Sequence, residues 1–212
     1  MAVRHPAKYS DQLLPVIAEM LSGSDLILDP FGGTGEKLHG IRPDAICLDL
    51  EPEWARVGCD LVGNALHLPF ADGTFDAVAT SPVYGNRMSD SFIDGQPDKK
   101  YDRNTYTHKL GRKLHPMNSG AMNWGEKYRQ FHWWAWKEVK RVVKPDGIFV
   151  LNIKDHYRKF KRIYATDWHI EALETIGFIE VSRRDIACTG NRQGQNGDAR
   201  IEYESVIKLH RP

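Results

Sequence analysis

Asp29-Pro30-Phe31-Gly32-Gly33-Thr34-Gly35 is the stretch of sequence that decides the fold. It follows the apolar residues 26–28, so it has the pattern of a buried strand that turns sharply into a helix. Such a turn needs glycine, because a residue without Cβ lets the backbone come close to a ligand. The stretch therefore predicts an α/β fold that binds a ligand at the carboxyl end of its first strand.

A second motif, Ser81-Pro82-Val83-Tyr84, follows the apolar strand predicted at residues 75–79. Ligands of open α/β sheets bind beyond the carboxyl ends of the strands, where the chain turns into loops. Two strands that each end in a special turn are expected to lie side by side at one edge of the sheet. The two motifs are therefore expected to form one site.

Strands and helices alternate through most of the chain. Apolar spacing predicts helices over 11–22, 36–40, from 53 onward, 133–143 and 168–176, and strands over 26–28, 45–49, 60–62, 75–79 and 148–153. This alternation implies a parallel sheet with right-handed crossovers. Residues 178–188 and 202–209 follow without a helix between them, which predicts an antiparallel pair that closes the sheet.

Composition limits the possible classes of protein. The 212 residues suit a single domain over 1–212, and the net charge of +1 excludes a basic field over the whole molecule. Cys47, Cys59 and Cys188 lack the spacing of a disulfide framework or a zinc site, so no metal is expected. No apolar run approaches the ~20 residues that cross a bilayer, and the amino terminus lacks a signal-peptide core, which predicts a cytoplasmic protein.

Together the two motifs resemble those of the S-adenosylmethionine-dependent amino-methyltransferases of nucleic acids. That family carries an Asp-Pro-Phe-x-Gly-x-Gly turn and a (Ser/Asn/Asp)-Pro-Pro-Tyr tetrapeptide, and the resemblance extends over residues 5–84 and 131–209. It implies a class I methyltransferase fold. This fold is a Rossmann-like sheet of seven strands, mostly parallel with an antiparallel last strand, and with helices on both faces.

The resemblance implies S-adenosylmethionine as cofactor and S-adenosylhomocysteine as product. Asp29 faces the cofactor's amino group, and Asp49 lies at the distance along the chain where an acid accepts the ribose hydroxyls in dinucleotide-type folds. Asn64 takes the adenine position, and Lys8 and Tyr9 form a lid. The expected cofactor-binding residues are Lys8, Tyr9, Asp29, Phe31, Gly32, Gly33, Gly35, Asp49, Leu50, Asn64 and Ala65. A nicotinamide or another nucleotide is the alternative ligand.

The tetrapeptide supplies the expected catalytic residues Ser81, Pro82 and Tyr84. The Ser81 hydroxyl and the Pro82 carbonyl can accept hydrogen bonds from an exocyclic amine, while Tyr84 offers a face for a flipped base. Serine at the first position favours cytosine N4 over adenine N6. Val83 replaces the second proline of the family pattern, which either is a tolerated variant or marks an inactive site.

Residues 86–130 form a polar insertion that follows the tetrapeptide directly. It contains nine basic residues against five acids, with interleaved aromatic residues that include Tyr106 and Tyr128. This composition predicts a nucleic-acid surface, with a solvated loop as the alternative. The expected substrate-binding residues are Arg87, Arg112 and Lys113, together with Arg192 in the glycine-rich segment 189–200.

The expected activity is methylation of an exocyclic amine of a DNA base. An RNA base and the side-chain amide of a protein glutamine are alternative substrates, and an inactive module that binds the cofactor or DNA is a further alternative. DNA is the expected partner, with RNA possible and no membrane, and the protein is expected to be a monomer or a homodimer.

Overall fold

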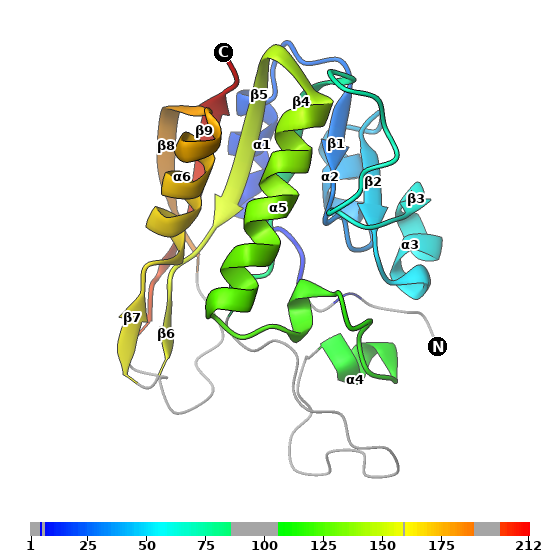
Figure 1. Ribbon diagram of the computed structural model, residues 1–212, viewed down its shortest axis with the longest axis vertical. Helices are drawn as coiled ribbons and strands as arrows, with labels where there is room; N and C mark the ends of the chain where they lie inside the picture. Colours follow the sequence, from blue (N-terminus) through cyan, green and yellow to red (C-terminus); the bar gives the residue numbers. More distant parts are fainter. Residues whose placement is uncertain (1–4, 6, 86–105, 159, 189–199) are drawn as a thin grey trace.

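A seven-stranded sheet forms the centre of the molecule (Figure 1). The computed structural model describes residues 5, 7–85, 106–158, 160–188 and 200–212. The strands of the sheet are β1 (Ile27–Asp29), β2 (Ile46–Asp49), β3 (Leu61–Val62), β4 (Phe75–Thr80), β5 (Val143–Ile153), β8 (Ile179–Ala187) and β9 (Tyr203–His210). Their order across the sheet is β3-β2-β1-β4-β5-β9-β8.

Strand directions agree with the predicted fold class. The neighbours from β3 to β5 pair in parallel, whereas β9 runs antiparallel to both β5 and β8. The expected sheet, mostly parallel with an antiparallel last strand, is therefore confirmed.

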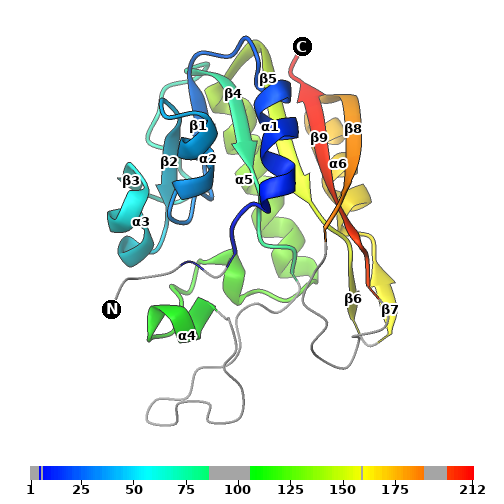
Figure 2. The ribbon, with the colours of Figure 1, turned by 180° about the vertical axis from the view of Figure 1, so that it is seen from behind.

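Helices cover both faces of the sheet (Figures 1 and 2). The 3-10 helix η1 (Asp11–Leu13), α1 (Leu14–Met20) and α2 (Glu36–Ile41) lie on one face, and α5 (Glu126–Val142) and α6 (Ala165–Ile176) lie on the other. Each face of the sheet carries a hydrophobic core, and neighbouring side chains of β4 point into different cores. Ala77 packs toward α1, whereas Val78 packs toward α5. Among the described residues, no helix is both long and apolar enough to span a bilayer.

The segment after the tetrapeptide differs from its predicted loop character. Its described part contains helix α4 (Tyr106–Leu110), the 3-10 turn η2 (Ser119–Ala121) and the first turns of α5, which begins at Glu126 rather than at 133. The hydrophobic pattern misses these turns of α5, because a tyrosine and a histidine occupy its buried face there. A hairpin of β6 (His156–Arg158) and β7 (Lys161–Ile163) was also not predicted.

The pairing register brings the two sequence motifs together. Leu28 of β1 pairs with Ile46 of β2 on one side and with Val78 of β4 on the other. Strands β1, β2 and β4 therefore end at the same edge of the sheet. Helix α3 (Pro52–Gly58) follows β2 at this edge.

Candidate active site

A cavity of about 250 Å³ lies at the carboxyl edge of the sheet. Both sequence motifs contribute to its wall. The predicted site residues that line it are Lys8, Tyr9, Asp29, Phe31, Gly32, Gly35, Asp49, Leu50, Asn64, Ala65, Ser81, Pro82 and Tyr84. The structure therefore gathers the predicted cofactor-binding and catalytic residues around one space, with Gly33 behind it.

The glycine turn, residues 29–35, is packed too closely for side chains at two of its glycines. A Cβ at Gly35 would lie 2.7 Å from the carbonyl oxygen of Gly58, and the φ angle of Gly35 is +66°. A Cβ at Gly32 would lie 2.8 Å from Cβ of Cys47. The turn therefore presents bare backbone to the cavity, which suits close approach of a ligand.

Asp49 ends β2 and ties the glycine turn to that strand. Its carboxylate accepts the backbone N–H of Gly33 at 2.9 Å and that of Glu51 at 2.8 Å. Burial raises the pKa of Asp49 to about 7, and these two hydrogen bonds oppose the rise. The carboxylate also lines the cavity, so it can accept further hydrogen bonds from a ligand's hydroxyl groups.

Asp29 joins β1 to β4 beneath the same cavity. One carboxylate oxygen accepts the Thr80 hydroxyl at 2.6 Å and the Phe31 N–H at 3.0 Å, while the Tyr9 hydroxyl lies 3.4 Å from the other oxygen. Burial raises the pKa of Asp29 to about 6, and these hydrogen bonds oppose the rise. Asp29 thereby fixes the start of the turn relative to the strand that carries the tetrapeptide.

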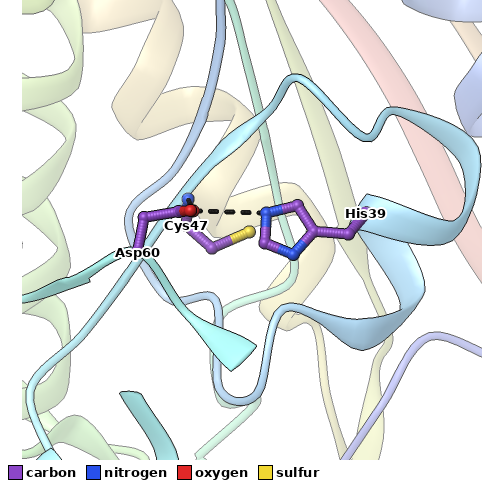
Figure 3. A group of neighbouring side chains, drawn as sticks. All are labelled: His39, Cys47 and Asp60. Atoms are coloured by element: carbon purple, nitrogen blue, oxygen red, sulfur yellow. Dashed lines mark hydrogen bonds and ion pairs between the residues drawn. The ribbon is translucent and has the colours of Figure 1, made fainter. Parts of the chain in front are cut away.

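His39, Cys47 and Asp60 form a cluster behind the glycine turn (Figure 3). Their donor atoms lie within 4.8 Å of one another and are of the kinds that bind Zn²⁺. They are already engaged with the protein, because Nε2 of His39 lies 2.9 Å from the Ala45 carbonyl and the Asp60 carboxylate accepts the Cys47 N–H at 2.7 Å. In this arrangement the cluster braces β2 behind the turn.

The amino-terminal segment closes one side of the cavity. The His5 ring packs edge-on against Trp54, with ring centroids 4.5 Å apart, and lies 5.3 Å from the ring of Tyr106. Burial lowers the pKa of His5 to about 4, so its ring is neutral near pH 7. Lys8 forms an ion pair with Glu36 at the start of α2. The sequence pattern of residues 5–9 predicts Lys8 and Tyr9 as lid residues but assigns no role to His5 or to Trp54.

The Tyr84 hydroxyl is the centre of a polar group at the opposite end of the cavity. It lies 3.0 Å from Ser81 Oγ, 3.1 Å from Asn152 Oδ1 and 3.2 Å from the carboxylate of Glu204. Burial, and next the nearby Glu204 charge, raise the pKa of Tyr84 well above 10, so the phenol keeps its proton. Glu204 also lines the cavity. No sequence motif marks Glu204, which lies on β9, far along the chain.

Glu51 organises the remaining wall. Its buried carboxylate accepts hydrogen bonds from Arg112 Nη2, the His115 backbone and the Asn118 amide, each at 2.8 Å. Arg112 also binds Glu53. The Arg112 guanidinium is therefore engaged by two carboxylates and does not line the cavity. Its predicted contact with substrate stays a prediction.

The other substrate-binding predictions are not gathered at the cavity either. Lys113 is exposed, and Arg87 and Arg192 lie outside the described residues. Among the aromatic residues expected to face nucleic acid, Tyr106 is 4% exposed and lines the cavity, whereas Tyr128 is 0% exposed and does not line it. The Tyr128 ring therefore belongs to the interior and does not contribute to an exposed base-stacking surface.

Comparison with known proteins identifies the fold. The sequence matches no protein-family model and no curated protein. The structure is similar to that of the [4+2]-cyclase SpnF, with a TM-score of 0.58, 15% identity and coverage of 95% of this chain and 81% of that one. A SAM-dependent methyltransferase of Thermotoga maritima, described as a possible histamine N-methyltransferase, gives a TM-score of 0.55 and 15% identity. The match covers 95% of this chain and 88% of that one.

The N-methyltransferase NodS of Bradyrhizobium japonicum, in complex with S-adenosyl-L-homocysteine, gives a TM-score of 0.53, 14% identity and coverage of 94% of this chain and 84% of that one. At such low identities the likeness shows the fold alone. The chain has the class I methyltransferase fold.

Proposed function

We propose that this protein is an S-adenosylmethionine-dependent methyltransferase that acts on an exocyclic amine of a DNA base, with cytosine N4 favoured over adenine N6. The observation that carries the proposal is that one cavity is lined by both the glycine turn and Ser81, Pro82 and Tyr84. A turn that approaches a cofactor and a tetrapeptide that accepts hydrogen bonds from an amine thus face the same space.

The residues present suit the cofactor. Gly32 and Gly35 line the cavity without side chains, because a Cβ at either position would clash with the protein packed behind the turn. Asp49 offers acceptors for two ribose hydroxyls. Asn64 and Asp29 also line the cavity; we expect the Asn64 amide oxygen to accept a hydrogen bond from the adenine amine and the Asp29 carboxylate to face the amino group of the methionine part. When bound, the cofactor supplies an activated methyl group on its sulfonium.

The substrate end of the cavity suits an amine with N–H groups to donate. The Pro82 carbonyl is an acceptor. The single Tyr84 proton is taken by Asn152 Oδ1 or the Glu204 carboxylate, which only accept. Ser81 Oγ can therefore donate to Tyr84 and still keep an acceptor lone pair. Hydrogen bonds from the substrate's N–H groups to these acceptors raise the density of the nitrogen lone pair. Glu204 adds a carboxylate to the same wall, which favours a substrate that donates hydrogen bonds.

Similar structures support a nitrogen acceptor in general terms. Both NodS and the Thermotoga maritima protein are described as N-methyltransferases, the latter as a possible one. Neither description concerns a nucleic acid. The choice of a DNA base therefore depends on the tetrapeptide and its resemblance to the amino-methyltransferases.

The side-chain amide of a protein glutamine is the second candidate substrate, with the same chemistry at nitrogen. The interior position of Tyr128 and the engagement of Arg112 by Glu51 and Glu53 favour it, because these groups do not contribute to a nucleic-acid surface. An RNA base remains the third.

Isotopically labelled S-adenosylmethionine, incubated with mixed pools of duplex DNA and RNA, tests the proposal. Each pool is digested to nucleosides and analysed by mass spectrometry. Label in N4-methylcytosine or N6-methyladenine from DNA supports the proposal, and label in RNA nucleosides alone replaces DNA by RNA. No label in either pool, with cofactor binding intact by calorimetry, contradicts a nucleic-acid substrate and directs the assay to glutamine peptides. The matched control is Ser81→Ala, which should keep cofactor affinity and lose transfer.

A further inference from the structure

Three buried side chains form a hydrogen-bonded chain that ends on the backbone of the tetrapeptide. Tyr128 and Trp136 lie on α5 and His169 lies on α6, and all three are 0% exposed. The Tyr128 hydroxyl lies 2.5 Å from the Val83 carbonyl oxygen and 2.9 Å from Nε2 of His169. The indole nitrogen of Trp136 lies 3.0 Å from Nδ1 of His169.

The chemistry of these groups fixes the direction of every bond. An indole N–H only donates, so Nδ1 of His169 accepts, and the neutral ring carries its proton on Nε2. Nε2–H therefore donates to the Tyr128 oxygen, and the single Tyr128 proton is left to donate to the Val83 carbonyl. Burial lowers the pKa of His169 well below 6.5, which keeps the ring in this neutral form.

The end point of this chain is the position at which the tetrapeptide departs from its family pattern. A proline there would hold φ near −65° through its ring, whereas valine leaves the backbone freer to rotate. A hydrogen bond to the carbonyl of the same residue restrains the peptide plane that follows it. That plane leads directly into Tyr84.

We propose that Tyr128, His169 and Trp136 are positioning residues that hold the Val83 carbonyl and so replace the rigidity of the missing proline. This inference rests on the proposed methyl transfer at the tetrapeptide. None of the three residues lines the cavity, so they act through the tetrapeptide rather than on the substrate. In this view the hydrogen-bonded chain, here called the brace, restrains the backbone at Val83 in place of a proline ring.

Tyr128→Phe is the first test, because it removes the hydroxyl and keeps the ring. We expect kcat to fall at least tenfold while the dissociation constant of the cofactor stays within twofold. The matched control is Tyr164→Phe, which changes an exposed phenol outside the cavity and should alter neither value. If Tyr128→Phe keeps its turnover, the proposal is wrong.

Val83→Pro in the Tyr128→Phe background is the second test. A rescue by proline would not be expected if Tyr128→Phe acted only through a general loss of packing. The described residues include no hydrogen-bond partner for the Val83 N–H, so proline removes no such bond there. We expect proline to raise kcat at least threefold more in the Tyr128→Phe variant than in the parent protein. Equal effects in both backgrounds would overturn the coupling. His169→Gln, which can still donate to Tyr128, should retain more activity than His169→Leu.

Two readouts separate this inference from the proposed function. If the parent protein labels no substrate, the proposed function fails, and the melting temperatures of Tyr128→Phe, Val83→Pro and the double variant still test the brace. Non-additive shifts support it, and additive shifts contradict it. ¹⁵N NMR of His169 should show Nε2 protonated and Nδ1 accepting, and the opposite tautomer would contradict the direction of the chain.

Discussion

The ionisation state of Asp49 is expected to affect cofactor binding. Its pKa of about 7 means that near neutral pH the empty site holds a mixture of carboxylate and carboxylic acid. Ribose hydroxyls donate more strongly to the carboxylate, because hydrogen bonds to a charged acceptor are the stronger ones. Cofactor binding is therefore expected to favour the ionised form.

We predict that cofactor affinity weakens as pH falls through 7. One unit below a pKa of about 7, roughly a tenth of the groups are ionised, so the dissociation constant should rise about tenfold between pH 8 and pH 6. Calorimetry across this range measures it. Asp49→Asn should bind about tenfold more weakly at pH 8 and lose this pH dependence. The same slope in the variant would assign the titration to another group, with Asp29 the first to examine because its pKa is about 6.

Individual residues were predictable where a motif marks them. Asp29 and the glycines occupy fixed places in a turn whose geometry tolerates few alternatives, and Asp49 ends the next strand at the expected distance along the chain. Glu204 and His5 reach the cavity only through the pairing of β9 and the path of the amino-terminal segment. Nothing in the local sequence marks Glu204, and the pattern of residues 5–9 indicates a lid without assigning a role to His5.

At the level of elements, α2 contains a matched pair of glycines at its start and near its end. Gly35→Ala places a Cβ 2.7 Å from a backbone oxygen at a φ of +66°, so we predict a loss of at least about 2 kcal/mol in the free energy of unfolding and much weaker cofactor binding. Gly40→Ala meets nothing within 4 Å, and we predict a gain of about 0.5–1 kcal/mol from helix propensity. Urea denaturation compares the two. Equal effects would contradict the steric argument.

Arg141 of α5 holds the loop that carries the predicted adenine contacts. It donates to the carbonyls of Phe70 and Leu68 at 2.8 and 3.0 Å and pairs with Glu138, which itself accepts the Leu68 N–H. We predict that Arg141→Met lowers the free energy of unfolding by about 2 kcal/mol, because two backbone acceptors lose their partner. Thermal melting should show a fall of roughly 4–8 °C.

The matched control for this prediction is Arg183→Met on β8. Its guanidinium pairs with Glu180 at the surface, where such pairs contribute about 0–1 kcal/mol. If Arg183→Met lowers the melting temperature as much as Arg141→Met does, the hydrogen bonds from Arg141 to the Phe70 and Leu68 carbonyls are not the cause of the loss.

Elements with a clear apolar period were predictable, and those without one were not. Short apolar runs gave the parallel strands, because strands covered on both faces are apolar along their length. The early turns of α5 bury Tyr128 and His132, and the Tyr128 hydroxyl is satisfied only by groups distant in sequence, on Val83 and His169. These hydrogen-bond partners are brought close only by the tertiary fold, so the local hydrophobic pattern cannot predict that such polar residues are buried.

At the scale of the whole molecule, the cavity is enclosed by segments from distant parts of the chain. The amino-terminal segment, residues 117–119 and β9 complete the wall begun by the glycine turn. Deletion of residues 1–8 removes the His5 contact with Trp54, and we predict cofactor dissociation about five- to tenfold faster, with little change in melting temperature. Stopped-flow chase experiments measure the rate. Arg184→Ala, which removes a surface ion pair with Glu19 outside the cavity, should keep the parent rate.

The reversed direction of β9 has a consequence for synthesis on the ribosome. Because β9 is antiparallel to β5, Glu204 at its start meets Tyr84 across most of the chain's length. Contacts of such long sequence separation form late, since the intervening chain must first be made and folded. The glycine turn and the tetrapeptide can emerge and pack early, but their shared pocket stays open on one side until β9 inserts. A nascent chain should therefore fold in stages, and the pocket should be complete only after β9 has been synthesised and has joined the sheet.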